Sequence, residues 1–176
     1  MCFETDAAKS LRGFEKFTAP VLKAAFGTNK IYSTERHDNE LAKVLDRNAG
    51  IDGFVVDRNG AIFAFASRVQ VGRNFQTFSI RRSRPSGKLT EFNKLANALQ
   101  LKPSYHVQTF VDADEQAATV ALAETPDVIE QIYRNPNQWR TTSDNETFFF
   151  IPWRNLDNVQ IFRIFADGRL EKKKTA

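Results

Sequence analysis

The sequence has a single cysteine and no long hydrophobic run, and each absence excludes a class of protein. Cys2 cannot form an internal disulfide, and the longest apolar stretches are far shorter than a membrane span. Residues 1–12 mix acidic and basic side chains without an apolar stretch, which predicts that no signal peptide is present. We therefore expect a protein without a membrane segment that works in the cytoplasm.

Phosphate-binding loops and internal repeats are also missing. No GxGxxG or GxxxxGK segment occurs, which argues against a nucleotide-binding domain. The length of 176 residues, with 41% hydrophobic and 26% charged residues, is typical of one globular domain over residues 1–176. The net charge of +4 favours anionic partners only weakly. Residues 171–176 form a charged tail that we expect to fray.

Two helical segments are predicted before the first strand. Apolar residues at helical spacing mark residues 6–26, and Pro20 should split this helix, because a proline removes a hydrogen bond from the helix interior. A shorter helix follows Ser33 or Thr34 and runs to about Arg47. Its predicted buried face consists of Leu41, Val44 and Leu45.

A three-stranded meander is the clearest structural signal in the chain. Ile51–Val56 is predicted as its first strand, and Asn59-Gly60 is typical of a tight hairpin turn. Ala61–Val71 and Phe75–Arg82 are predicted as the second and third strands. Further elements are predicted as a helix over 89–99, strands over 105–111, 117–123, 147–152 and 159–165, and a helix opened by Thr125-Pro126. Strands that come in succession before a helix favour an α+β fold.

Positive charge is concentrated along the meander. No acidic residue lies between Asp57 and Glu91. The cations of this stretch are Arg58, Arg68, Arg73, Arg81, Arg82, Arg84 and Lys88. Arginine forks bind phosphate oxygens in a bidentate manner, so the stretch predicts a nucleic-acid interface made by Arg73, Arg81, Arg82, Arg84 and Lys88. The alternative is that these arginines are solvated strand residues.

Strand geometry and aromatic residues refine this interface. Neighbouring residues of a strand point to opposite faces, so only one of Arg81 and Arg82 shares a face with Arg73. We expect it to be Arg81, because Phe78 and Ile80 mark the opposite, core-facing side. Phe75, Phe78 and Trp139 are candidates for base stacking. The alternative for the phenylalanines is the core, since 16 of them in one small domain must mostly be buried.

The hairpin also brings polar groups together. Pairing across a two-residue turn joins residues whose numbers sum to 119, and a longer loop changes that sum by one or two. In each case Asp52 lies beside residues 66–70, and Glu40 is close enough in sequence to reach the same edge. Two acids beside polar groups on a neighbouring strand are typical of a magnesium-dependent phosphodiesterase. Otherwise, Asp52 simply caps a strand, and Glu40 is a surface acid near Lys43 or Arg47.

In element order and motif position, residues 34–111 resemble the PD-(D/E)XK nuclease superfamily, whose core is helix, three-stranded meander, helix and strand. The resemblance implies a restriction-endonuclease-like core over 34–111 with a mixed α/β C-terminal extension over 112–170. It also implies that Glu40 and Asp52 are metal-site acids that bind Mg²⁺. The family has Glu-x-Lys or a close variant near the end of the second strand.

This chain has Ala66-Ser67-Arg68 or Arg68-Val69-Gln70 at that place, with no carboxylate and no lysine. In the resembling site, Arg68 replaces the lysine and Gln70 offers a neutral oxygen to the metal. Arginine cannot act as a base and an amide carries no charge, so both replacements weaken the catalytic interpretation.

Two hypotheses follow for function. The first is a nuclease-like domain that binds nucleic acid and has kept, altered or lost magnesium-dependent cleavage, with Glu40, Asp52, Arg68 and Gln70 as the catalytic set. The second is a small phage or mobile-element protein that binds and inhibits a host protein complex. His37, Asp38 and Glu40 form one further ligand cluster, but their spacing matches no zinc pattern.

Overall fold

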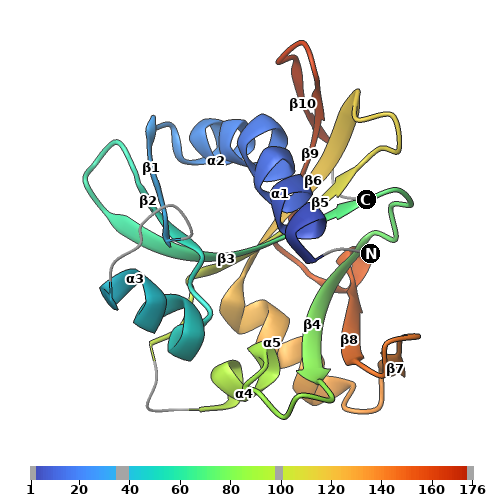
Figure 1. Ribbon diagram of the computed structural model, residues 1–176. Coiled ribbons are helices and arrows are strands. Elements are labelled where there is room, and N and C mark those ends of the chain that lie inside the picture. The colour runs from blue at the N-terminus through green and yellow to red at the C-terminus, as the bar shows by residue number, and fades with distance from the viewer. Residues whose placement is uncertain (1–2, 35–39, 98–100, 174–176) are drawn as a thin grey trace.

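The computed structural model describes residues 3–34, 40–97 and 101–173, and its helices and strands are shown in Figure 1. The helical elements are α1 (Phe3–Gly13), η1 (Phe14–Thr18), α2 (Ala19–Phe26), α3 (Glu40–Val44), η3 (Leu45–Ala49), α4 (Glu91–Ala96), α5 (Thr125–Arg134) and η4 (Trp153–Asn155). The strands are β1 (Lys30–Ser33), β2 (Gly53–Val56), β3 (Ile62–Val71), β4 (Thr77–Ser83), β5 (Tyr105–Val111), β6 (Ala117–Glu124), β7 (Trp139–Thr141), β8 (Thr147–Pro152), β9 (Gln160–Phe165) and β10 (Leu170–Lys173).

Two sheets organise these strands, and the chain is mixed α/β. Sheet A has seven strands in the order β1-β2-β3-β5-β6-β9-β10, with β3 and β5 parallel and all other neighbours antiparallel. Sheet B has three antiparallel strands in the order β4-β8-β7. None of the described helices is long and apolar enough to cross a membrane.

The first hairpin forms where the sequence predicts it, with a loop one residue longer than the tightest turn. Val56 pairs with Ile62, so partner numbers sum to 118. The Asp57 amide donates to the Ala61 carbonyl at 2.9 Å, and Gly60 has a φ of +85° within the loop. This register sets Asp52 beside Ala66, because Gly53 pairs with Phe65.

The prediction that the third strand of the meander pairs with the second strand is wrong. β4 does not pair with β3 but crosses to sheet B, where it pairs with β8. The free edge of β3 is instead occupied along its length by β5, from Phe65–Tyr105 to Val71–Val111. β1, which precedes α3, supplies the third antiparallel strand on the other side of β2.

Two helix predictions also need correction. Pro20 does not split the first helix, because the π-helical turn η1 runs directly into α2 and leaves Pro20 in the first turn of α2. In α3, Leu41 and Val44 are 68% and 48% exposed, whereas Ala42 is buried. The expected buried face is therefore wrong for those two residues. The segment 35–39 lies outside the described residues.

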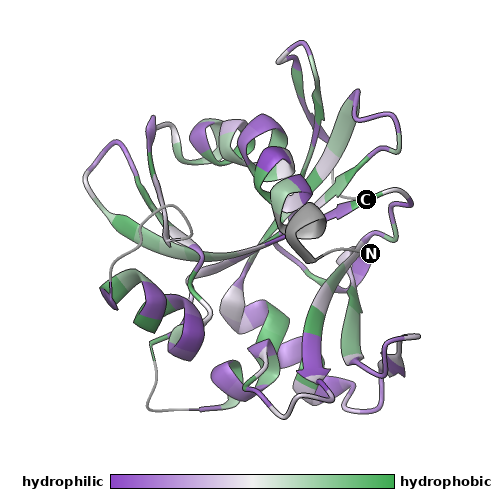
Figure 2. Cartoon of the chain, in the orientation of Figure 1, coloured by the Kyte–Doolittle hydropathy of each residue, from purple (hydrophilic) through white to green (hydrophobic). Residues whose placement is uncertain are grey.

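The described residues form two large hydrophobic clusters and a small one around Ile51. One large cluster lies between sheet A and the α1–η1–α2 helix and includes Phe17, Phe65 and Phe162. The other large cluster lies between the two sheets and α4 and α5 and includes Phe78 and Phe149. Figure 2 shows hydrophilic and hydrophobic residues alternating around the α1–α2 helix, as expected for a helix with one face on a sheet.

Candidate functional site

Asp52 lies directly beside β3, as the hairpin register predicts. Its backbone amide donates to the Phe65 carbonyl at 2.9 Å. Its Oδ2 accepts a hydrogen bond of 2.6 Å from the backbone amide of Ser67. The strand approaches closely here because Gly53 has no side chain: a Cβ at this position would lie 2.5 Å from both the Phe65 ring and the Tyr32 carbonyl. The carboxylate of Asp52 is thereby held against the backbone of β3.

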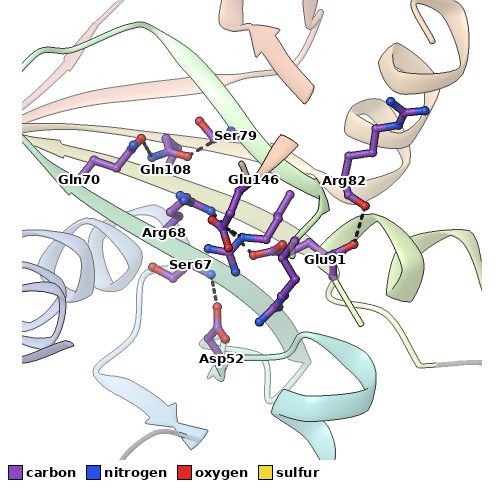
Figure 3. Close-up of polar contacts among 12 residues, drawn as sticks. Asp52, Ser67, Arg68, Gln70, Ser79, Arg82, Glu91, Gln108 and Glu146 are labelled. Atoms are coloured by element: carbon purple, nitrogen blue, oxygen red, sulfur yellow. Dashed lines mark hydrogen bonds and ion pairs between the residues drawn. The ribbon is translucent and has the colours of Figure 1, made fainter. Parts of the chain in front are cut away.

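Arg68, which Figure 3 shows beside Glu91 and Glu146, lies close to Arg81, and each of the two arginines forms an ion pair with a glutamate. Arg81 Nε lies 3.1 Å from Glu146 Oε2, and Arg68 Nη1 lies 3.8 Å from Glu91 Oε1. Both guanidinium groups stack on the Phe148 ring, at 4.6 Å for Arg68 and 5.3 Å for Arg81. The cluster is therefore charge-compensated and packed on an aromatic surface.

Burial lowers the pKa of the Arg68 guanidinium below its usual value. The positive charge of Arg81 acts in the same direction, while Glu91 and Glu146 act against it. Arginine nevertheless stays protonated in proteins, so Arg68 is a fixed cation and not a proton donor or acceptor.

Two cavities flank Arg68. The larger, of about 260 Å³, is lined by residues of α1, β1, β3 and β4 and includes Ser33, Asp52 and Arg81. The smaller, of about 90 Å³, shares Asp52, Ser67 and Arg68 with the first. Its lining includes three buried polar atoms without a hydrogen-bond partner among the described residues: Ser67 Oγ, Glu91 Oε2 and His106 Nε2. The polar side chains that surround Arg68 thus leave space for water or for part of a bound molecule.

His106 lies on β5 next to Ala66 of β3. Burial lowers the pKa of its imidazole to about 4, so the side chain is neutral near pH 7. Of the two cavities described above, it lines only the smaller. A neutral imidazole carries no positive charge that would attract a phosphate group near pH 7.

Gln108 connects the two sheets, and Gln70 is its partner within sheet A. Gln108 Nε2 donates to Gln70 Oε1 at 3.0 Å, and Gln108 Oε1 accepts from the Ser79 backbone amide at 3.3 Å. The second bond satisfies an amide of β4 on the edge that β8 does not cover. The Gln70 oxygen that was expected to face a metal therefore accepts from the side chain that attaches β4 to sheet A.

Glu40 is not part of this cluster. Its side chain is 89% exposed and forms an ion pair with Lys43 at 3.5 Å, the surface role considered for it in the sequence. It lines neither of the two cavities around Arg68. His37 and Asp38, the other members of the predicted ligand cluster, lie outside the described residues.

The described residues do not fit a magnesium centre. β3 contributes no carboxylate next to Asp52, whose Oδ2 already accepts from Ser67, and the oxygen of Gln70 is bonded to Gln108. Over residues 8–34, 40–97 and 101–173, whose side chains the structure describes, no three His, Cys, Asp or Glu side chains are placed to hold one ion. Hard cations need several oxygen ligands, and the carboxylates of Asp46, Asp52 and Glu91, which line the smaller cavity, are not placed to share one ion.

Arg68 and Arg81 each have a carboxylate partner, whereas the remaining cations of the predicted interface have none among the described residues. Arg73 lies over the Phe75 ring at 5.5 Å, and Arg82 lies over the Trp139 ring at 4.6 Å. Arg84 donates to the Leu89 carbonyl at 3.0 Å, and Lys88 is exposed. Within the part of the chain that the structure describes, none of Arg73, Arg82, Arg84 and Lys88 has an ion pair with a carboxylate. We call these four residues the outer cations.

Arg81 was expected to share the interface with Arg73, but its side chain is 22% exposed and paired with Glu146. As expected, Arg81 lies on the face opposite Phe78 and Ile80. The face of Arg81 is not open to solvent, however, because Phe148 and Arg68 pack there. Arg82 follows the alternation of the strand and lies on the face of Ile80, over Trp139 and Phe149, and the β-bulge between Arg81 and Ser83 leaves it without a pairing partner on β8. Of these two arginines, Arg82 and not Arg81 lacks a carboxylate partner among the described residues.

Sequence reasoning missed the two glutamates that compensate the arginines. Glu91 follows Thr90, which caps α4 in a capping box with Asn93, and that signal fixes Glu91 in the first turn. Glu146 lies just before β8, far from β3 and β4 in sequence, and no local pattern indicates its pairing with Arg81.

The chain matches no protein-family model, no curated protein and no solved structure.

Proposed function

We propose that this protein binds nucleic acid through the outer cations, and that its nuclease-like core does not cleave the bound strand. The proposal is based on one observation: some cations of the chain are paired with carboxylates and others are not. Arg68 and Arg81 are matched by Glu91 and Glu146 inside the molecule, whereas the outer cations have no carboxylate partner in the described residues. Uncompensated arginines on a surface attract phosphate and release its counterions, which favours binding at low salt.

The order of elements supports the nuclease-like part of the proposal. The α1–α2 helix is followed by the neighbouring antiparallel strands β1, β2 and β3, then by α4 and β5. This is the order helix, three strands, helix, strand of the resembling superfamily, with β1 in place of β4. The α3–η3 segment and β4 are insertions into that order.

The register favours one of the two segments considered for the expected Glu-x-Lys. Asp52 lies beside Ala66, and side chains two apart on a strand share a face, so Ala66 and Arg68 are on the side of Asp52. In the proposed correspondence, Ala66 stands at the position of the acid and Arg68 at that of the lysine. A methyl group binds no cation and an arginine is not a base, which favours binding without metal-dependent cleavage.

The test is a binding assay in which labelled DNA and RNA are incubated with the protein in EDTA and, separately, in Mg²⁺ or Mn²⁺. We expect similar affinity in both conditions and intact nucleic acid after long incubation. The double variant Arg82→Ala/Lys88→Ala should bind more weakly. The matched control Lys23→Ala/Lys30→Ala removes the same charge from two other exposed lysines and should bind normally. Metal-dependent cleavage that Asp52→Ala abolishes would refute the non-cleaving proposal, and equal affinity of all variants would refute the interface.

A second candidate function, binding to a protein partner, is favoured by α3. Leu41 and Val44 are exposed on this helix although its pattern predicts them to be buried. Exposed apolar residues on one helix are typical of a protein contact. A stoichiometric partner that is captured after nuclease treatment, and that is lost in Leu41→Ser/Val44→Ser, would support this function and make it the leading one.

A further inference from the structure

Two arginine–aromatic pairs lie at the two ends of β4. At the beginning, Arg73 lies over Phe75, whose side chain is 55% exposed. At the end, Arg82 lies over Trp139, which is 39% exposed. Both arginines belong to the outer cations. The third residue considered for stacking, Phe78, is 2% exposed and belongs to the core.

The Phe75 ring is held by packing, and the Trp139 ring lies against the Arg82 guanidinium. The Phe75 ring meets the buried Phe110 ring edge-on, with centroids 6.2 Å apart. Trp139 belongs to β7, where its backbone pairs with Phe149 of β8. A ring that is already fixed loses little conformational entropy when a ligand stacks on it, so both rings are suited to binding flat molecules.

Arg82 is oriented by the same surroundings. Its guanidinium lies 4.6 Å from the Trp139 ring and 5.9 Å from the Phe149 ring. A guanidinium that lies flat over a ring keeps its N–H groups in its own plane, parallel to the ring, and directs them toward the rim, where they can bind a phosphate in bidentate fashion. An exposed ring beside such a guanidinium offers a stacking surface and a phosphate contact at the same place.

We propose that these two pairs bind unpaired bases, so that the preferred ligand is a single-stranded nucleic acid. The proposal rests on the proposed function, because it names the strand type that the outer cations meet. Base faces are hidden in a duplex and free in a single strand, and aromatic stacking is therefore useful only for the latter. The seven residues of β4 separate the pairs by about 23 Å at ~3.3 Å per residue, so several nucleotides are needed to reach both.

The experiment compares oligothymidine with a duplex of the same number of phosphates, using the full chain and its tryptophan fluorescence. Trp139 and the buried Trp153 are its only tryptophans. We expect the single strand to bind more tightly and to quench the emission of the wild type, but not that of Trp139→Phe, which retains Trp153 alone. Trp139→Ala and Phe75→Ala should each lose about 5- to 100-fold in affinity for the single strand and little for the duplex. Tyr133→Ala removes another exposed ring, on α5, and should bind like the wild type.

The outcomes separate the two proposals. Equal affinity for both strand types, with unchanged Trp139 emission, would overturn the single-strand proposal and leave nucleic-acid binding in place. The absence of binding to either probe would overturn both. Equal losses for Tyr133→Ala and Trp139→Ala would also overturn the single-strand proposal, because the effect would then not depend on the arginine–aromatic pairs.

Discussion

The buried imidazole of His106 makes the stability of this protein depend on pH in a way that can be calculated. The side chain is 5% exposed, and its Nε2 has no hydrogen-bond partner in the described residues. Burial lowers its pKa from 6.5 to about 4. The charged or titratable groups that line the same cavity are Asp46, Asp52, Arg68, Glu91 and Lys94. We therefore expect His106 to be neutral in the folded protein over most of the accessible pH range.

The sign and the size of the effect follow from linkage. As pH falls through 6.5, the unfolded chain binds a proton at His106 and the folded chain does not, so folding becomes less favourable. The loss continues until the pH reaches about 4, where the folded protein is also protonated. The full difference, at about 1.36 kcal/mol per pH unit, amounts to about 3 kcal/mol. Between pH 7.5 and pH 5 the expected loss is about 2 kcal/mol.

The assay is urea unfolding of the wild type and of His106→Gln at pH 7.5 and pH 5. Carboxylates also titrate near pH 5, but they contribute equally to both proteins and cancel in the comparison. The wild type should lose about 2 kcal/mol more than the variant. An NMR titration of the His106 ring checks the same reasoning without a mutation and should show a neutral ring at pH 5. A ring that is protonated at pH 5, or an equal pH dependence in both proteins, would refute the interpretation of His106 as a buried group whose Nε2 has no hydrogen-bond partner among the described residues.

Three further predictions concern the hairpin, the arginine pair and the metal. Gly60→Val should destabilise the protein by more than about 1 kcal/mol, because a β-branched residue resists the φ of +85° found there; an unchanged melting temperature would contradict this. Glu146→Gln should destabilise by about 1 kcal/mol by leaving half-buried Arg81 without its carboxylate, and Glu130→Gln, on an exposed pair, is the control expected to have little effect. Ala66→Glu/Arg68→Lys should gain Mn²⁺ binding measurable by calorimetry, because it adds a carboxylate next to Asp52; no heat of binding would show that the register is misassigned.

The parts of the fold that local sequence determines are the parts that the sequence predicts well. Asn59-Gly60 marks the hairpin, Thr125-Pro126 opens α5, and the strands β5, β6, β8 and β9 lie close to their predicted ranges. The place of β4 could not be predicted in this way. Its position depends on β5 taking the edge of β3, a pairing between segments about 40 residues apart that leaves no signal in the turn at residues 72–76.

The same distinction applies to the site. The proximity of Asp52 to residues 66–70 follows from the turn and was predictable. The acid-free stretch predicts a strongly basic surface, but in space Glu91 and Glu146 compensate two of its arginines. Ion pairs between distant segments are invisible in composition. The sequence also does not show which of Arg81 and Arg82 is matched by a carboxylate. Glu146, which pairs with Arg81, and Trp139, which lies under Arg82, both belong to distant segments of the chain.

The salt dependence of binding tests the central claim most directly. The affinity for oligothymidine is measured between about 50 and 200 mM salt for the wild type, for Arg82→Ala/Lys88→Ala, and for the control Lys23→Ala/Lys30→Ala. If the outer cations contact phosphates, the slope of log affinity against log salt should become shallower by about 1.4 in the first variant, at ~0.7 per phosphate contact on a single strand, and stay unchanged in the control. Equal slopes in all three proteins would contradict the proposal that the outer cations bind nucleic acid.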